Sequence, residues 1–170
     1  GSADTTNSTP ASRVLGLDQG ELNAIKAGKL IIGDTTTGGN IRVASAVTTA
    51  DTTGNLFLKT AGNVNIDNNL TVGTTGGKNL SIEATGTNST VGGAGTVKAN
   101  ELKIKGSNAT VAMAAAANQI STISADVKSL AFKNGKSLSV GTVFAGTTDE
   151  QSGITTTGDT SLTTTVGDLT

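Results

Sequence analysis

The residue types that most enzymes use for catalysis are scarce in this 170-residue chain, which has no His, Cys, Trp or Tyr. Without imidazole or thiolate groups, there is no His base, no Cys nucleophile and no ordinary zinc or iron site. Glycosidic cleavage commonly needs two neighbouring carboxylates, yet Asp67 and Glu83 fall at different positions of the repeat described below. The sequence therefore predicts a protein that is not an enzyme and holds no cofactor or metal.

Lysines supply one candidate for ligand binding. Residues 98–136 hold six Lys against two acidic residues, a net charge of +4, while residues 137–170 hold four acids and no base. Such a basic band attracts anionic glycans, for example sulfated polysaccharides, and the candidate glycan-binding residues are Lys103, Lys105 and Lys133. The alternative is a solvated face that prevents lateral aggregation. Without aromatic residues among these lysines, nucleic acid is not an expected partner.

Two other polar patterns, the glycosylation sequons and a group of acidic residues, could each be a functional site or an ordinary turn or loop. Asn-x-Ser/Thr sequons occur at Asn7 and at four candidate glycosylation sites, Asn69, Asn79, Asn88 and Asn108, although Asn is also a common turn residue. Asp149, Glu150 and Asp159 lie near an apparent insertion, TTDEQSG, where a cation site competes with an acidic loop. The stretch GGAGTVKAN is similar to a calcium-binding nonapeptide, but Val97 replaces the required Asp.

Apolar residues recur with a period near 24, which predicts a repeat architecture. The pairs of the first column are Leu30/Ile32, Leu56/Leu58, Leu80/Ile82, Leu102/Ile104 and Leu130/Phe132. The second column runs Ile41/Val43, Val64/Ile66, Val91, Val111/Met113 and Leu138/Val140, and the third runs Val47, Leu70/Val72, Val97, Ile120 and Val143. Each pair is typical of a short strand with one face turned inward.

Three interleaved columns predict an all-β fold, a three-sided parallel β-solenoid of roughly six coils, with strands about 4.8 Å apart. An antiparallel β-sandwich is the alternative, because short strands with regular turns also describe that fold. The outward positions of the first column place Lys59, Glu83 and Lys105 on successive coils, where they are expected to form a short charge ladder.

The N-terminal part is expected to differ from the solenoid. Residues 1–10 are predicted to be a disordered tag or linker, since Gly1-Ser2 is typical of a cloning scar, and residues 11–170 a single solenoid segment of a longer protein. LDQGELNAIKAG predicts a short helix with Asp18 as N-cap. We expect Leu22 and Ile25 of this helix to cover the outward side chains Ile31 and Phe57. The chain shows no signal peptide and no transmembrane run.

The segment GTVKANELKIKGSNATVAMAAAANQISTISADVKSLAFKNGKSLSVGTV, followed by GITTTGDTSLTTTVGDLT, resembles repeats of filamentous-haemagglutinin-type exoproteins exported by two-partner secretion. LGLDQGELNAIKAGKLIIG also looks like a segment that opens such arrays, so the resemblance covers about residues 14–170. It implies a right-handed parallel β-helix in a long secreted or cell-surface bacterial adhesin. It also implies an outer-membrane secretion partner and no direct membrane insertion.

The expected function is that of a structural shaft or adhesive segment, contributing to cell attachment or biofilm. The alternative is a glycan-binding β-helix module that uses the Lys-rich face or the 144–153 loop. In either case the partner is a glycan or protein of a host or bacterial surface.

Overall fold

The computed structural model describes residues 18–36 and 39–170, apart from the side chains of residues 115 and 116. The predicted disordered segment 1–10, with the sequon at Asn7, lies outside this part. In chain order the elements are α1 (Gln19–Ala24), β1 (Ala27–Asp34), β2 (Ile41–Val43), β3 (Val47–Thr48), β4 (Thr53–Thr60), β5 (Val64–Ile66), β6 (Leu70–Thr71), β7 (Leu80–Ala84), β8 (Thr90–Gly92), β9 (Val97–Asn134), β10 (Ser139–Val140), β11 (Thr142–Val143), β12 (Gln151–Ser152), β13 (Ile154–Thr156) and β14 (Thr160–Thr164).

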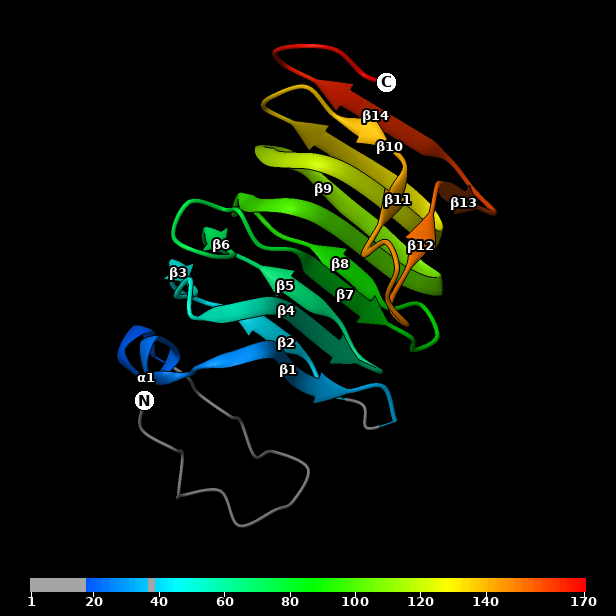
Figure 1. The fold of residues 1–170 in the computed structure, drawn as a ribbon. Coiled ribbons are helices and arrows are strands. Elements are labelled where there is room, and N and C mark those ends of the chain that lie inside the picture. The colour runs from blue at the N-terminus through cyan, green and yellow to red at the C-terminus, as the bar shows by residue number, and fades with distance from the viewer. Residues whose placement is uncertain (1–17, 37–38) are drawn as a thin grey trace.

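Three ladders of parallel strands stack from the α1 end towards the C-terminus (Figure 1). The first ladder joins β1, β4, β7 and β9, the second joins β2, β5, β8 and β9, and the third joins β3, β6 and β9. Leu30, Leu56, Leu80 and Leu102 stand in register, as the first column predicted. This parallel pairing rules out the antiparallel sandwich.

The chain is therefore a parallel β-solenoid of about four turns with one short helix. The count of roughly six coils and the right-handed sense stay predictions. Within the described residues no helix has the length and apolar character that crossing a membrane requires.

The interior is a continuous stack of aliphatic side chains, each contributing about 1.5–3 kcal/mol by its burial. The middle turns are fully enclosed, whereas some inward residues of the end strands are only partly buried. At the N-terminal end these residues are Leu30, Ile32, Ile41 and Val47, and at the C-terminal end they are Val140, Ile154 and Leu162. The core is thus best formed where a strand has neighbours on both sides.

The second and third predicted columns fail in the last turns, where β9 runs through all three ladders as one uninterrupted strand, whereas Leu130 and Phe132 of the first column lie in the core as predicted. Val140 was predicted to follow Val111 and Met113, but it pairs with Ile123. β13 likewise pairs with Ala125 to Val127. The apolar spacing did not predict that residues 122–127 of β9 form this row. The row follows an alanine-rich stretch and combines Ile123 with small side chains, so no Leu/Ile pair marks it.

Two buried asparagines, one within β9 and one at its last residue, satisfy backbone groups of this long strand. The side-chain oxygen of Asn118 accepts the N–H of Val97 at 2.8 Å, and its amide nitrogen donates to the Met113 and Lys133 carbonyl oxygens. Asn134 accepts the N–H of Ile120 at 3.0 Å and donates to the Ile120 carbonyl oxygen at 2.8 Å. These amides replace ladder bonds that a bent strand loses, since a buried backbone group needs a partner.

Gly93 marks a corner that no other residue fits well. Its φ is +132°, and a Cβ there would lie 2.1 Å from the backbone oxygen of Ile66 on the preceding coil. The close approach of two coils therefore requires glycine.

Helix α1 has the predicted N-cap and capping box: the Asp18 carboxylate accepts the N–H of Glu21, and the Glu21 carboxylate accepts the N–H of Asp18. The Gln19 side chain joins the helix to β3 by two hydrogen bonds: its amide nitrogen donates to the Thr48 backbone oxygen, and its amide oxygen accepts the Thr48 N–H. The predicted cover is wrong, because Ile31 stays 49% exposed. Phe57 is indeed outside the main core, but Val143 and Phe144 cover it.

Candidate functional site

The outward side of the first ladder holds the densest set of charged and aromatic contacts in the described part of the chain. Strand alternation turns Phe57, Ser81 and Lys103 outward in register on successive coils. Beside them, Lys59 and Glu83 form a second row. We call Lys29 and these five residues the outer patch.

A hairpin crosses the outer patch. It leaves the coil after β10, returns at β13, and contains the antiparallel pair β11–β12 (Figure 1). Its base is closed by Thr142 and Ser152, whose hydroxyl oxygens lie 2.6 Å apart, and by the Gly153 N–H, which donates to the Gly141 carbonyl oxygen at 3.0 Å. We call residues 142–152 the strap.

Aromatic packing holds the strap on the patch. The rings of Phe57 and Phe144 have centroids 5.3 Å apart and are tilted by 51°, a favourable arrangement for two aromatic side chains. Val143 completes this cluster, which is separate from the main core. Val143 was predicted to point inward in the third column, and that prediction is wrong because the strap carries it outside the coil. The Lys29 ammonium lies 4.1 Å from the Phe57 ring centroid.

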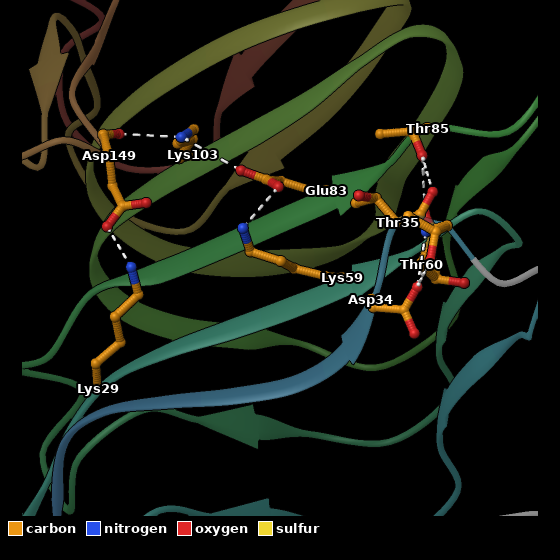
Figure 2. Close-up of polar contacts among 10 residues, drawn as sticks. Lys29, Asp34, Thr35, Lys59, Thr60, Glu83, Thr85, Lys103 and Asp149 are labelled. Atoms are coloured by element: carbon orange, nitrogen blue, oxygen red, sulfur yellow. Dashed lines mark hydrogen bonds and ion pairs between the residues drawn. The ribbon is translucent and has the colours of Figure 1, made fainter.

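A chain of polar and ionic contacts links the outer patch to the strap (Figure 2). The Lys29 ammonium lies 2.5 Å from an Asp149 carboxylate oxygen, and the Lys103 ammonium donates to the Asp149 backbone oxygen at 3.0 Å. The Glu83 carboxylate then joins Lys103, at 3.5 Å, to Lys59, at 3.0 Å. Two of these residues are well shielded from water: the Lys103 side chain is 6% exposed and that of Glu83 is 14% exposed.

Two further contacts fix the strap along its length. The Glu101 carboxylate accepts the backbone N–H of Phe144 at 2.7 Å and the side-chain amide of Asn79 at 2.8 Å. Gln151 donates to the Ile104 backbone oxygen at 3.4 Å. The strap is therefore anchored at both ends as well as at its centre.

The patch contains one polar group that the strap leaves unsatisfied. The Ser81 side chain is fully buried, and its hydroxyl has no hydrogen-bond partner among the residues that the structure describes. Burial of a hydroxyl without a partner costs about 1–3 kcal/mol.

The three lysines predicted to bind glycans do not share one exposed surface. Lys103 is buried beneath the strap, Lys105 is exposed on the same strand, and Lys133 is half-buried and pairs with Thr163. The predicted charge ladder is confirmed for Lys59 and Glu83. The second partner of Glu83 is Lys103, and no ion pair between Glu83 and Lys105 occurs in the described residues. Glycan binding by the lysines stays a prediction.

Three of the four candidate glycosylation sites, Asn69, Asn88 and Asn108, are exposed, and Asn88 has a φ of +57°, which Asn tolerates in turns. Asn69 accepts two hydrogen bonds from Thr96, and Asn79 is half-buried and bonded to Glu101. Modification of these four residues stays a prediction.

The acidic residues of the 144–153 loop have protein partners. Asp149 pairs with Lys29, and Glu150 accepts the backbone N–H of Gly146 at 2.7 Å. No cluster of three or more His, Cys, Asp or Glu side chains in residues 18–36 and 39–170 has the arrangement that a metal ion needs.

Sequence reasoning missed the strap itself. One signal was present: the chain has only three Phe, of which Phe57 lies at an outward strand position and Phe144 lies in the 144–153 loop. An outward aromatic side chain needs a cover, and this loop carried the matching aromatic residue.

Comparisons with known proteins return no match to this chain among protein-family models, curated proteins or solved structures.

Proposed function

We propose that this solenoid is a shaft segment of a secreted or cell-surface bacterial adhesin, which gives length and stiffness to the longer protein and so contributes to attachment or biofilm. The observation that carries the proposal is the construction of the fold. The turns from β1 to the start of β9 contribute inward aliphatic residues in register to three parallel ladders, and further turns of this kind add length without a new core.

The ends of the stack support the same proposal. Inward apolar residues that are fully enclosed in the middle turns are partly exposed in β1, β2 and β3 and again in β10, β13 and β14. Further turns of the same kind would bury these side chains and pair the edge strands, which are otherwise prone to association. A shaft continued in both directions accounts for this pattern.

The resemblance to filamentous-haemagglutinin-type repeats supplies the finer parts of the proposal. They are the right-handed sense of the coil, export with an outer-membrane secretion partner, and location at the bacterial surface. The surface molecule that the complete adhesin recognises is a glycan or protein, and the shaft holds the recognition regions away from the cell.

A surface-binding assay on the isolated chain tests the shaft role. Beads coated with the folded chain should attach to host cells and to bacterial lawns no better than beads coated with an unrelated β-solenoid of similar net charge. Attachment several times above that control, lost in the variant Lys105→Gln/Lys133→Gln, would show instead that the chain is itself a receptor-binding module.

A further inference from the structure

We propose that the outer patch is a peptide-binding site that the strap occupies in the absence of a ligand. The ligand that would displace the strap is an acidic peptide with an aromatic residue. This inference goes beyond the shaft function and does not depend on it. It rests on the contacts that the strap makes, on the strained backbone of Phe144, and on two groups beneath the strap, the Ser81 hydroxyl and the Lys103 ammonium, whose polar contacts are incomplete or long.

The strap defines the chemistry of the ligand. An aromatic side chain, Phe144, packs on Phe57, and a carboxylate five residues later, from Asp149, meets the Lys29 ammonium at 2.5 Å. The backbone N–H of Phe144 itself donates to the Glu101 carboxylate. A peptide with an aromatic residue whose backbone N–H is free to donate, followed five positions later by an acidic residue, reproduces these three contacts.

The strap occupies the patch in a strained conformation. Phe144 has a φ of +54°, a left-handed conformation that non-glycine residues rarely adopt. Such a conformation is unfavourable for a residue with a side chain and persists only where its surroundings enforce it. A separate peptide, without the tether to β10 and β13, is free to place the same ring on Phe57 without that strain.

The strap also leaves hydrogen-bonding groups of the patch incompletely satisfied. The Ser81 hydroxyl is buried with no partner among the described residues. The neighbouring Lys103 ammonium donates to a backbone oxygen and lies 3.5 Å from Glu83, a long distance for an ion pair that is so well buried. An additional acceptor oxygen at this position, from Asp, Glu, Asn or Gln of a partner, would satisfy both groups.

Charge favours an acidic partner. Without the strap, the ammonium groups of Lys29, Lys59 and Lys103 in the outer patch stand beside the carboxylate of Glu83 in the patch and that of Glu101 next to it, so these five groups together carry one positive charge in excess. Two glycines with positive φ lie where the strap has to bend to leave the patch, Gly146 at +72° within it and Gly153 at +69° directly after it.

The test uses a fluorescently labelled peptide with the strap sequence VFAGTTDEQS, residues 143–152, and the full chain. In the variant Phe144→Ala/Asp149→Asn the strap loses its ring and its carboxylate, and we expect the peptide to bind at least tenfold more tightly than to the wild type. The matched peptide VAAGTTNEQS, which lacks the same two groups, should not bind. Adding Lys29→Gln to the variant should weaken binding of the first peptide at least fivefold.

The following results distinguish a peptide-binding patch from an unfolded variant and from a glycan-binding site. Circular dichroism first checks that the variant keeps its β-sheet spectrum, and if it does not, Asp149→Asn alone is used with the same criteria. Equal binding of both peptides, or no binding to a folded variant, would overturn the proposal. Displacement of the peptide by an oligogalacturonate at lower concentration than by unlabelled peptide would also overturn it, because the site would then be one for acidic glycans.

Discussion

At the scale of single residues, the buried asparagine amides are expected to contribute more to the stability of the fold than the exposed ion pairs do. Asn134 is fully buried and makes hydrogen bonds in both directions with Ile120, and it also donates to the Lys136 backbone oxygen at 2.9 Å. Its amide nitrogen faces carbonyl oxygens, so no side chain without two N–H donors fits there. The exposed pair Arg42–Asp67, in contrast, is expected to contribute only about 0–1 kcal/mol.

The substitution Asn134→Asp tests this role. It replaces the donating nitrogen with an oxygen that faces carbonyl oxygens, and we expect the free energy of unfolding to fall by at least about 3 kcal/mol. Urea denaturation followed by circular dichroism measures the change. Asn108→Asp, the same substitution at an exposed position of β9, is the control and should change stability by no more than about 0.5 kcal/mol. Equal effects of the two substitutions would contradict the assigned role.

A second residue-scale prediction concerns pH. The hydroxyl of Thr74 donates to the Asp51 carboxylate, its backbone N–H donates at 2.8 Å, and Lys78 is nearby, so the pKa of Asp51 lies below its ordinary value. Because the folded pKa is lowered, the stabilisation is present above the unfolded pKa, near 3.8, and is lost as pH falls through the lower folded pKa.

Removing the hydroxyl should therefore raise the pKa of Asp51. We expect Thr74→Val to move it back towards 3.8, though not fully, since the backbone N–H still donates. Titration of the Asp51 carboxyl carbon by NMR in wild type and variant measures the shift. An unchanged pKa in the variant would mean that the hydroxyl bond does not form in solution.

At the scale of elements, the sequence predicted the strands better than their cover. Leucine and isoleucine at alternate positions predicted the first ladder correctly as far as Leu102, because the inward side of a strand must be apolar. The outward Phe57 signalled that a cover was needed, but periodicity holds no information on which segment supplies it. The strap reaches Lys29 from Asp149, 120 residues away, through contacts that only the folded coil creates.

A double-mutant cycle measures how firmly the strap is held. Phe57→Ala removes a fully buried ring, and we expect a loss of about 3 kcal/mol in the free energy of unfolding. Phe144→Ala should cost less, because that ring is attached to a strained segment. The two losses should fall short of additivity by about 1 kcal/mol, the coupling typical of a tilted aromatic pair. Strict additivity would indicate that the rings do not touch in solution.

At the scale of the whole molecule, the fold is a repeat whose unit is a turn of the coil. Val64 stacks between Ile41 and Val91, and Leu70 pairs with Val97, so residues 64–90 make up one complete turn. The length of the stack and the irregular last turns follow from packing that periodicity alone does not describe.

Removal of one complete turn tests the repeat directly. After deletion of residues 64–90, Val91 can take the place of Val64 on Ile41, and Leu102 the place of Leu80 on Leu56. We expect this variant to keep a β-sheet spectrum and a single unfolding transition, and to be shorter by about 4.8 Å in small-angle scattering. Deletion of residues 64–76, only part of a turn, is the control and should abolish cooperative unfolding. Similar behaviour of both deletions would contradict the modular stack.

The shaft role itself is tested most directly in the bacterial surface protein to which the proposal assigns this segment. Attachment of the bacteria to their target surface is measured after the segment is deleted, and again after it is replaced by an unrelated parallel β-solenoid with the same number of turns. A shaft segment predicts that deletion weakens attachment and that the replacement restores it. Failure of the replacement to restore attachment, with surface display unchanged, would contradict the account, because a specific surface of this chain would then be required.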